Sequence, residues 1–124
     1  MKKTLKIKEH LTNTDIYICY GNEEYQKIQK KLNISNKIEL KCNGYASRID
    51  ADNGDFICYL VGINDNTDNV YWLKSTIVHE LSHIVTFIME KYGFVCDEYR
   101  SYLLGYLYEK AMVWFDKVLS LESL

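Results

Sequence analysis

Residues 70–92 read VYWLKSTIVHELSHIVTFIMEKY, a long run that contains neither glycine nor proline. Apolar side chains recur along it at helical spacing, which predicts one long helix with most of its circumference buried. The members of this stripe are Leu73, Ile77, Leu81, Ile84 and Ile88. Gly93 is expected to end the helix, and the polar loop 64–69 precedes it.

A narrow polar stripe on this helix contains the pattern His79-Glu80-Leu81-Ser82-His83. Residues four apart lie one above the other on a helix, so both imidazoles leave the same face and can bind one metal ion. Glu80 lies about 100° around the axis, where its carboxylate can reach a water on that ion. Neutral imidazoles and an open position for water suit zinc.

The alternative is that both histidines are ordinary core or surface residues that bind no ion. A solvated polar stripe usually carries Lys or Gln, and this one has neither. Burying two imidazoles and a carboxylate without partners would also be costly. Both arguments favour a metal site.

A third ligand must come from outside the pair, since two histidines do not complete a catalytic zinc site. Glu98 fits best because it opens the next helix just after the reversal at Gly93, and Asp97 shares that possibility or orients a ligating imidazole. His10 is a distant possibility. Glu90 is excluded because seven residues separate it from His83, about 10 Å along the axis.

The last helix is expected from about residue 97 to 119, with Glu98 and Tyr102 on one side. Gly105 on that side predicts a close approach of two helices, since glycine otherwise weakens a helix. Tyr102 or Tyr71 is a candidate donor to the transition state, although core packing is the more ordinary role of a tyrosine.

The other expected elements precede the motif helix. They are a strand at 15–20, a short helix capped by Asn22, and strands at 38–49 and 56–63 joined by the turn Asp52-Asn53-Gly54-Asp55. The order predicts an α+β fold in which a small mixed sheet packs on the motif helix and the last helix crosses behind the site.

Length and composition restrict the function classes. The 124 residues are expected to form one domain, 1–124. A net charge of −2 argues against nucleic acid as the main partner. Cys19, Cys42, Cys58 and Cys96 are scattered without a Cys-x-x-Cys pair, and no apolar run is long enough to span a membrane. A cytoplasmic protein with free thiols is the simplest expectation, and the oligomeric state is left open.

The motif His79-Glu80-Leu81-Ser82-His83, followed by Glu98-Tyr99-Arg100-Ser101, resembles the zincin metallopeptidases of the branch with two histidines and a glutamate as ligands. The chain is similar to the minimal, single-domain members found in phage and bacterial genomes. The resemblance implies one Zn²⁺ held by His79, His83 and Glu98, with Glu80 as general base in the hydrolysis of a protein or peptide substrate. It also implies that the peptide binds as an added strand, for which residues 56–63 are the expected sheet edge.

Two other functions remain open from the sequence. One is a zincin-shaped binding or structural protein that holds metal without turnover. The other is a non-metal interaction domain in which the motif arose by chance.

Overall fold

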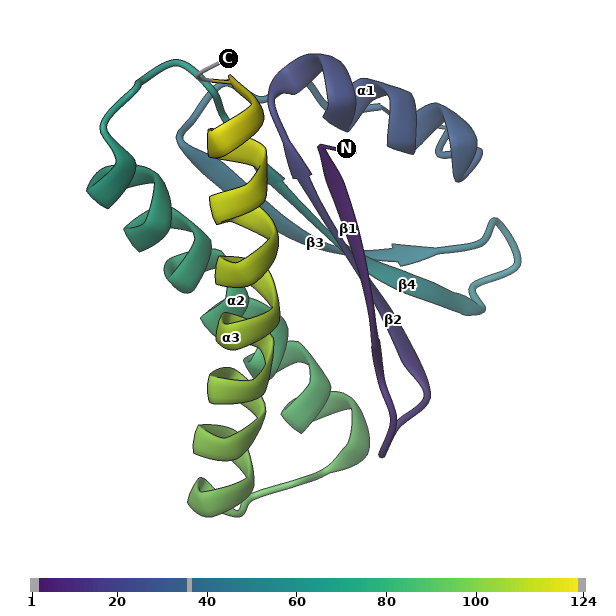
Figure 1. Ribbon diagram of the computed structural model, residues 1–124. Helices are drawn as coiled ribbons and strands as arrows, with labels where there is room; N and C mark the ends of the chain where they lie inside the picture. Colours follow the sequence, from purple (N-terminus) through teal and green to yellow (C-terminus); the bar gives the residue numbers. More distant parts are fainter. Residues whose placement is uncertain (1–2, 36, 123–124) are drawn as a thin grey trace.

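The computed structural model describes residues 3–35 and 37–122, which form four strands and three helices in an α+β arrangement (Figure 1). In chain order these are β1 (Thr4–Glu9), β2 (Thr14–Tyr20), α1 (Asn22–Lys31), β3 (Gly44–Asp50), β4 (Phe56–Ile63), α2 (Val70–Tyr92) and α3 (Asp97–Glu122).

The four strands form one mixed sheet in the order β1-β2-β4-β3. β1 and β2 are antiparallel, β2 and β4 are parallel, and β3 and β4 are antiparallel. Helix α1 packs on one face of the sheet, while α2 and α3 cover the other (Figure 1). The expectation of a small mixed sheet packed on the motif helix is therefore confirmed.

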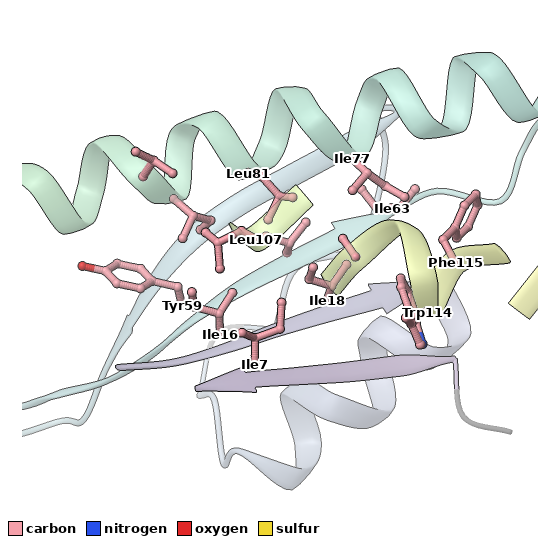
Figure 2. Close-up of a cluster of buried hydrophobic side chains, with 14 of the residues drawn as sticks. Ile7, Ile16, Ile18, Tyr59, Ile63, Ile77, Leu81, Leu107, Trp114 and Phe115 are labelled. Atoms are coloured by element: carbon pink, nitrogen blue, oxygen red, sulfur yellow. The ribbon is translucent and has the colours of Figure 1, made fainter. Parts of the chain in front are cut away.

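The larger hydrophobic core lies between the sheet and the pair α2 and α3 (Figure 2). Ile16, Ile18 and Tyr59 project from the sheet towards Ile77 and Leu81 of α2. A smaller core under α1 joins Tyr25 and Ile28 to residues on the opposite sheet face. The alternating directions of strand side chains supply both cores from the same strands.

The strand expected at 38–49 begins later, at Gly44, because side chains of α1 satisfy the preceding backbone. The carbonyl of Ile38 accepts hydrogen bonds from the amides of Gln26 (2.7 Å) and Gln29 (2.8 Å). Asn22 Oδ1 accepts from the backbone amide of Leu40 (2.8 Å). Asn22 was expected to cap α1, but the cap position is Gly21 and has no side-chain cap bond.

The hairpin between β3 and β4 forms as its sequence predicts. Gly54 has a φ of 90°, a conformation that glycine adopts without strain. The backbone amides of Ala51 and Gly54 close the turn by donating to the carbonyls of Asp55 (2.7 Å) and Ala51 (2.8 Å).

β1 was not anticipated, because its apolar positions alternate with lysines. Ile7 points into the core, whereas Lys6 and Lys8 point outward and lie near Asp15 of β2. The segment reads as a polar amino-terminal stretch unless its period of two is recognised.

The expected sheet edge was wrong. β4 is an interior strand, paired to β2 on one side and to β3 on the other. The edges are β1 and β3, and β3 is the one that lies beside the motif helix. A strand rich in buried apolar residues, as β4 is, belongs in the middle of a sheet that is covered on both faces.

Within residues 3–35 and 37–122, no helix is long and apolar enough to cross a membrane.

Candidate metal centre

Helix α2 holds the motif, and both of its ends are fixed by caps. The Asn69 side chain accepts a hydrogen bond from the backbone amide of Trp72 (3.1 Å). At the other end Gly93 is left-handed, with a φ of 68°, and Phe94 donates back to the carbonyl of Met89 (2.9 Å). The helix between them matches the expected range of 70–92.

The two imidazoles point to a common place above the helix. Nε2 of His79 and Nε2 of His83 are 3.2 Å apart, with the rings nearly perpendicular at 84°. Two nitrogen ligands at ~2.0–2.1 Å from a tetrahedral ion would be about 3.3–3.4 Å apart. The observed separation therefore fits the spacing of two ligands on one zinc-sized ion.

Glu80 completes a compact group with these rings. One ligand atom from each of His79, Glu80 and His83 can be chosen so that all lie within 4.8 Å of one another. In residues 3–35 and 37–122 no other set of three or more His, Cys, Asp or Glu side chains meets so closely. The group has a donor set that could hold a metal ion.

The carboxyl group of Glu80 is buried although both histidines are exposed. Burial raises the pKa of Glu80, and the nearby imidazoles of His79 and His83 lower it by less. A carboxylate with a raised pKa takes up a proton more readily, which is the property a general base needs.

Both histidines are exposed, so the cost of burying an imidazole without a partner is not evidence for a metal site here. An imidazole in contact with water carries little desolvation cost, so no partner is required to explain it. What supports the site is the distance between the two Nε2 atoms, which fits two ligands of one ion, and the presence of Glu80 in the same group.

Gly44 is a site residue that sequence reasoning missed. A β-carbon built on Gly44 would lie 3.0 Å from Oε2 of Glu80 and 2.8 Å from Cγ2 of Thr76. The first residue of β3 thus passes directly against the buried carboxylate and leaves no room for a side chain. The sequence signal was a glycine inside the strand predicted at 38–49, since a glycine in a strand interior often marks a close backbone approach.

The expected third ligands, Glu98 and Asp97, do not belong to the group. Arg100 of α3 donates from both terminal nitrogens to Oγ1 of Thr86 (3.3 Å each), and α2 and α3 run antiparallel (Figure 1). Counting along the two antiparallel helices from this contact gives the position on α3 that lies opposite His83. Glu98 is five residues from that position, or about 7.5 Å along the helix axis. Both acidic side chains are exposed at the far end of α2.

The part of α3 beside His79 carries no carboxylate directed at the histidines. Lys74 Nζ of α2 lies 2.9 Å from Asp116 Oδ1 of α3. Counting along both helices from this contact, and from the contact of Arg100 with Thr86, places residues 107–111 of α3 opposite His79. Glu109 in that window lines a hollow on the β1 side of α3. Tyr108 in the same window is close enough to Lys74 of α2 to contribute to the raised pKa of that lysine.

The other candidates lie apart from the histidines. Tyr102 and His10 line a separate hollow with Tyr99 and Tyr106. Tyr71 is 85% exposed near the start of α2. The close approach expected at Gly105 is wrong, because a β-carbon there would meet nothing within 4 Å.

The larger hollows also lie elsewhere. One of about 560 Å³ opens between α1 and the β3–β4 hairpin, and one of about 680 Å³ lies by the loop before α2. Neither is lined by His79, Glu80 or His83.

Comparison with protein-family models, with curated proteins and with solved structures found no match for this chain.

Proposed function

We propose that this chain is a zinc-dependent peptidase of the zincin type, with His79 and His83 as metal ligands and Glu80 as general base. The observation that carries the proposal is the 3.2 Å spacing of the two Nε2 atoms, with the buried carboxylate of Glu80 beside them. Zinc is the proposed ion because two neutral imidazoles on one helix face suit it.

The chain's own residues would supply proton transfer and positioning. Bound zinc lowers the pKa of water and polarises a carbonyl group. Glu80 would take a proton from the attacking water as its oxygen adds to the carbonyl carbon. When the C–N bond breaks, Glu80 would return that proton to the leaving amine. Burial of this carboxyl group, which raises its pKa, suits both transfers.

The proposed substrate is an extended peptide added to the free edge of β3. That edge starts against Glu80 at Gly44, so a strand paired with it would pass close to the histidines. The opposite edge, β1, carries Lys6 and Lys8, a common device against strand addition. β3 has only Arg48 as a basic residue.

The test combines metal binding with turnover. Purified protein is dialysed against zinc, and bound metal is measured for the wild type, His79→Ala and Glu80→Gln. The proposal expects near one equivalent in the wild type and in Glu80→Gln, and strong loss in His79→Ala. Hydrolysis of an unstructured protein such as casein should occur with the wild type alone. Turnover retained in Glu80→Gln would remove Glu80 as the base.

A second candidate function is metal binding without turnover. It is favoured by one observation: Glu109, the carboxylate in the part of α3 level with His79, lines a hollow on the β1 side of that helix. Zinc bound near one equivalent with no hydrolysis of any peptide would favour this alternative. No zinc bound after dialysis would contradict both candidates.

A further inference from the structure

A basic and aromatic cluster lies on the α2 side of the sheet, near the end of β3. It comprises Arg48 of β3, Phe56 and Tyr59 of β4, and Phe87 and Lys91 of α2, and we call it the Arg48 cluster. Arg48 and Tyr59 are direct partners in the β3–β4 register. The Phe56 ring lies 4.8 Å from the Tyr59 ring, which stacks on Phe87 at 5.8 Å.

Two cations meet on the ring of Phe56. Lys91 Nζ is 3.5 Å from the ring centroid, and Arg48 Cζ is 5.2 Å from it. Arg48 Nε donates to Oδ1 of Asp50 (2.8 Å), so one of the two charges has a partner. Lys91 pairs with no carboxylate in the part of the chain that the structure describes. The Arg48 cluster thus has one positive charge in excess.

The cluster also contains a buried polar atom without a partner. Tyr59 is 0% exposed, and its hydroxyl has no hydrogen-bond partner among the described residues. Burial raises the pKa of Tyr59 and the charge of Arg48 lowers it by less, so the guanidinium and the phenol are close. A buried hydroxyl without a partner destabilises a fold, so an acceptor brought by a ligand would be favoured there once the side chains that cover the hydroxyl moved aside.

The Arg48 cluster shares a strand face with the candidate metal centre. Gly44, Ala46 and Arg48 alternate along β3 towards the α2 side, and Gly44 is the residue against Glu80. Four residues of strand span about 13 Å. A peptide paired with β3 would therefore place one residue at Glu80 and another, about four positions away, at Arg48 and Lys91.

We propose that the Arg48 cluster is a subsite for an acidic side chain of a peptide bound along β3. The inference rests on the proposed function for the location of the peptide. The carboxylate of that side chain would bind between Arg48 and Lys91 and accept a hydrogen bond from the hydroxyl of Tyr59. The subsite selects substrates with Asp or Glu about four residues from the cleaved bond.

The test measures binding without turnover. The probe is a fluorescein-labelled peptide of eight residues, rich in Thr and Val, in which one Glu is moved through every position. Each peptide has matched Gln and Lys versions, and all are titrated into Glu80→Gln protein. We expect the Glu peptide to bind about threefold to fivefold tighter than the Gln peptide at one or two positions, the range of a solvent-accessible charge pair.

Three variants separate the subsite from general charge attraction. Arg48→Gln with Lys91→Gln should abolish the preference for Glu, and Tyr59→Phe should reduce it while the fold is retained. Lys6→Gln with Lys8→Gln removes the same charge from the other edge strand and should leave the preference unchanged. Equal binding of Glu and Gln peptides at all positions would overturn the subsite. Loss of the preference in the Lys6 and Lys8 variant would also overturn it.

The two proposals fail in different ways. Peptide binding with the Glu preference but no hydrolysis by zinc-loaded wild type would contradict the peptidase and retain the subsite. Hydrolysis with no preference for an acidic residue would contradict the subsite and retain the peptidase.

Discussion

Gly44 of β3 lies so close to Glu80 of α2 that a β-carbon at residue 44 would be 3.0 Å from Oε2 of the carboxylate. This contact joins the free edge of the sheet to the polar side of the motif helix. It also explains the burial of Glu80, because backbone and not solvent covers that side of the carboxyl group.

Replacement of Gly44 should therefore damage both stability and the site. We expect Gly44→Ala to lower the free energy of unfolding by about 1–3 kcal/mol, the usual cost of overpacking, and to displace Glu80. Urea unfolding measures the first effect, and peptide hydrolysis with bound zinc the second. Gly54→Ala is the control for adding a β-carbon where there is room, because a β-carbon at Gly54 would meet no atom within 4 Å. The positive φ of Gly54 adds backbone strain to that variant. Full activity in Gly44→Ala would contradict the role assigned to this contact.

A carboxylate introduced at residue 108 should strengthen zinc binding. Tyr108 lies in the window of α3 that is level with His79, so Tyr108→Glu would add a carboxylate at the level of the histidine pair. We expect zinc affinity to rise at least about tenfold, the lower end of what one supporting group contributes to a metal site.

The control for that variant is Tyr102→Glu, which adds the same charge on the side of α3 that lines the hollow with His10. Its zinc affinity should stay near that of the wild type, as should that of Glu98→Ala. Competition with a chromogenic chelator measures all three. A large loss of affinity in Glu98→Ala would instead support Glu98 as the third ligand.

Gly105→Ala should stabilise the protein. Gly105 is inside α3, and an added β-carbon meets nothing within 4 Å. Alanine in an exposed helix interior is favoured over glycine by about 0.5–1 kcal/mol. Thermal or urea unfolding should show this gain. Gly62→Ala should do the opposite, because its β-carbon would lie 2.7 Å from Cδ1 of Tyr25.

The buried thiols should make stability fall at alkaline pH. Burial raises the pKa of Cys19 to about 12 and that of Cys58 to about 11. In the folded chain both thiols have a pKa above that of a thiol in the unfolded chain. Their contribution to the free energy of unfolding is therefore fully present below pH ~8.5 and is lost as the pH rises through the pKa values of the folded chain. Each thiol should contribute a slope of up to about 1.4 kcal/mol per pH unit.

Urea unfolding between pH 8 and 11 tests this dependence, with Cys19→Ala as the variant that should flatten it. Iodoacetamide offers a second measurement. At pH 8 it should modify the exposed Cys42 and Cys96 in the folded chain, and Cys19 and Cys58 only after denaturant is added. Rapid alkylation of Cys19 without denaturant would contradict its burial.

The strongest sequence patterns predicted their elements well. The helix 70–92, the strand 56–63 and the turn at Gly54 follow from local periodicity and glycine chemistry, which act over a few residues. The convergence of His79, Glu80 and His83 follows in the same way, since helical spacing alone brings them together.

Features that depend on distant contacts were not predictable in this way. The start of β3 is set by hydrogen bonds from Gln26 and Gln29 of α1, and its place at the sheet edge is set by the parallel pairing of β2 with β4. The position of Glu98 depends on how far α3 is offset along α2, which the short connection at Gly93 does not determine.

The outward direction of the two imidazoles also affects how an ion would come and go. Because His79 and His83 are exposed on the outer side of α2, an ion bound there would exchange with the surroundings without any opening of the chain. Occupancy would then follow the free metal concentration outside the protein, and a chelator would remove the ion from the fully folded molecule.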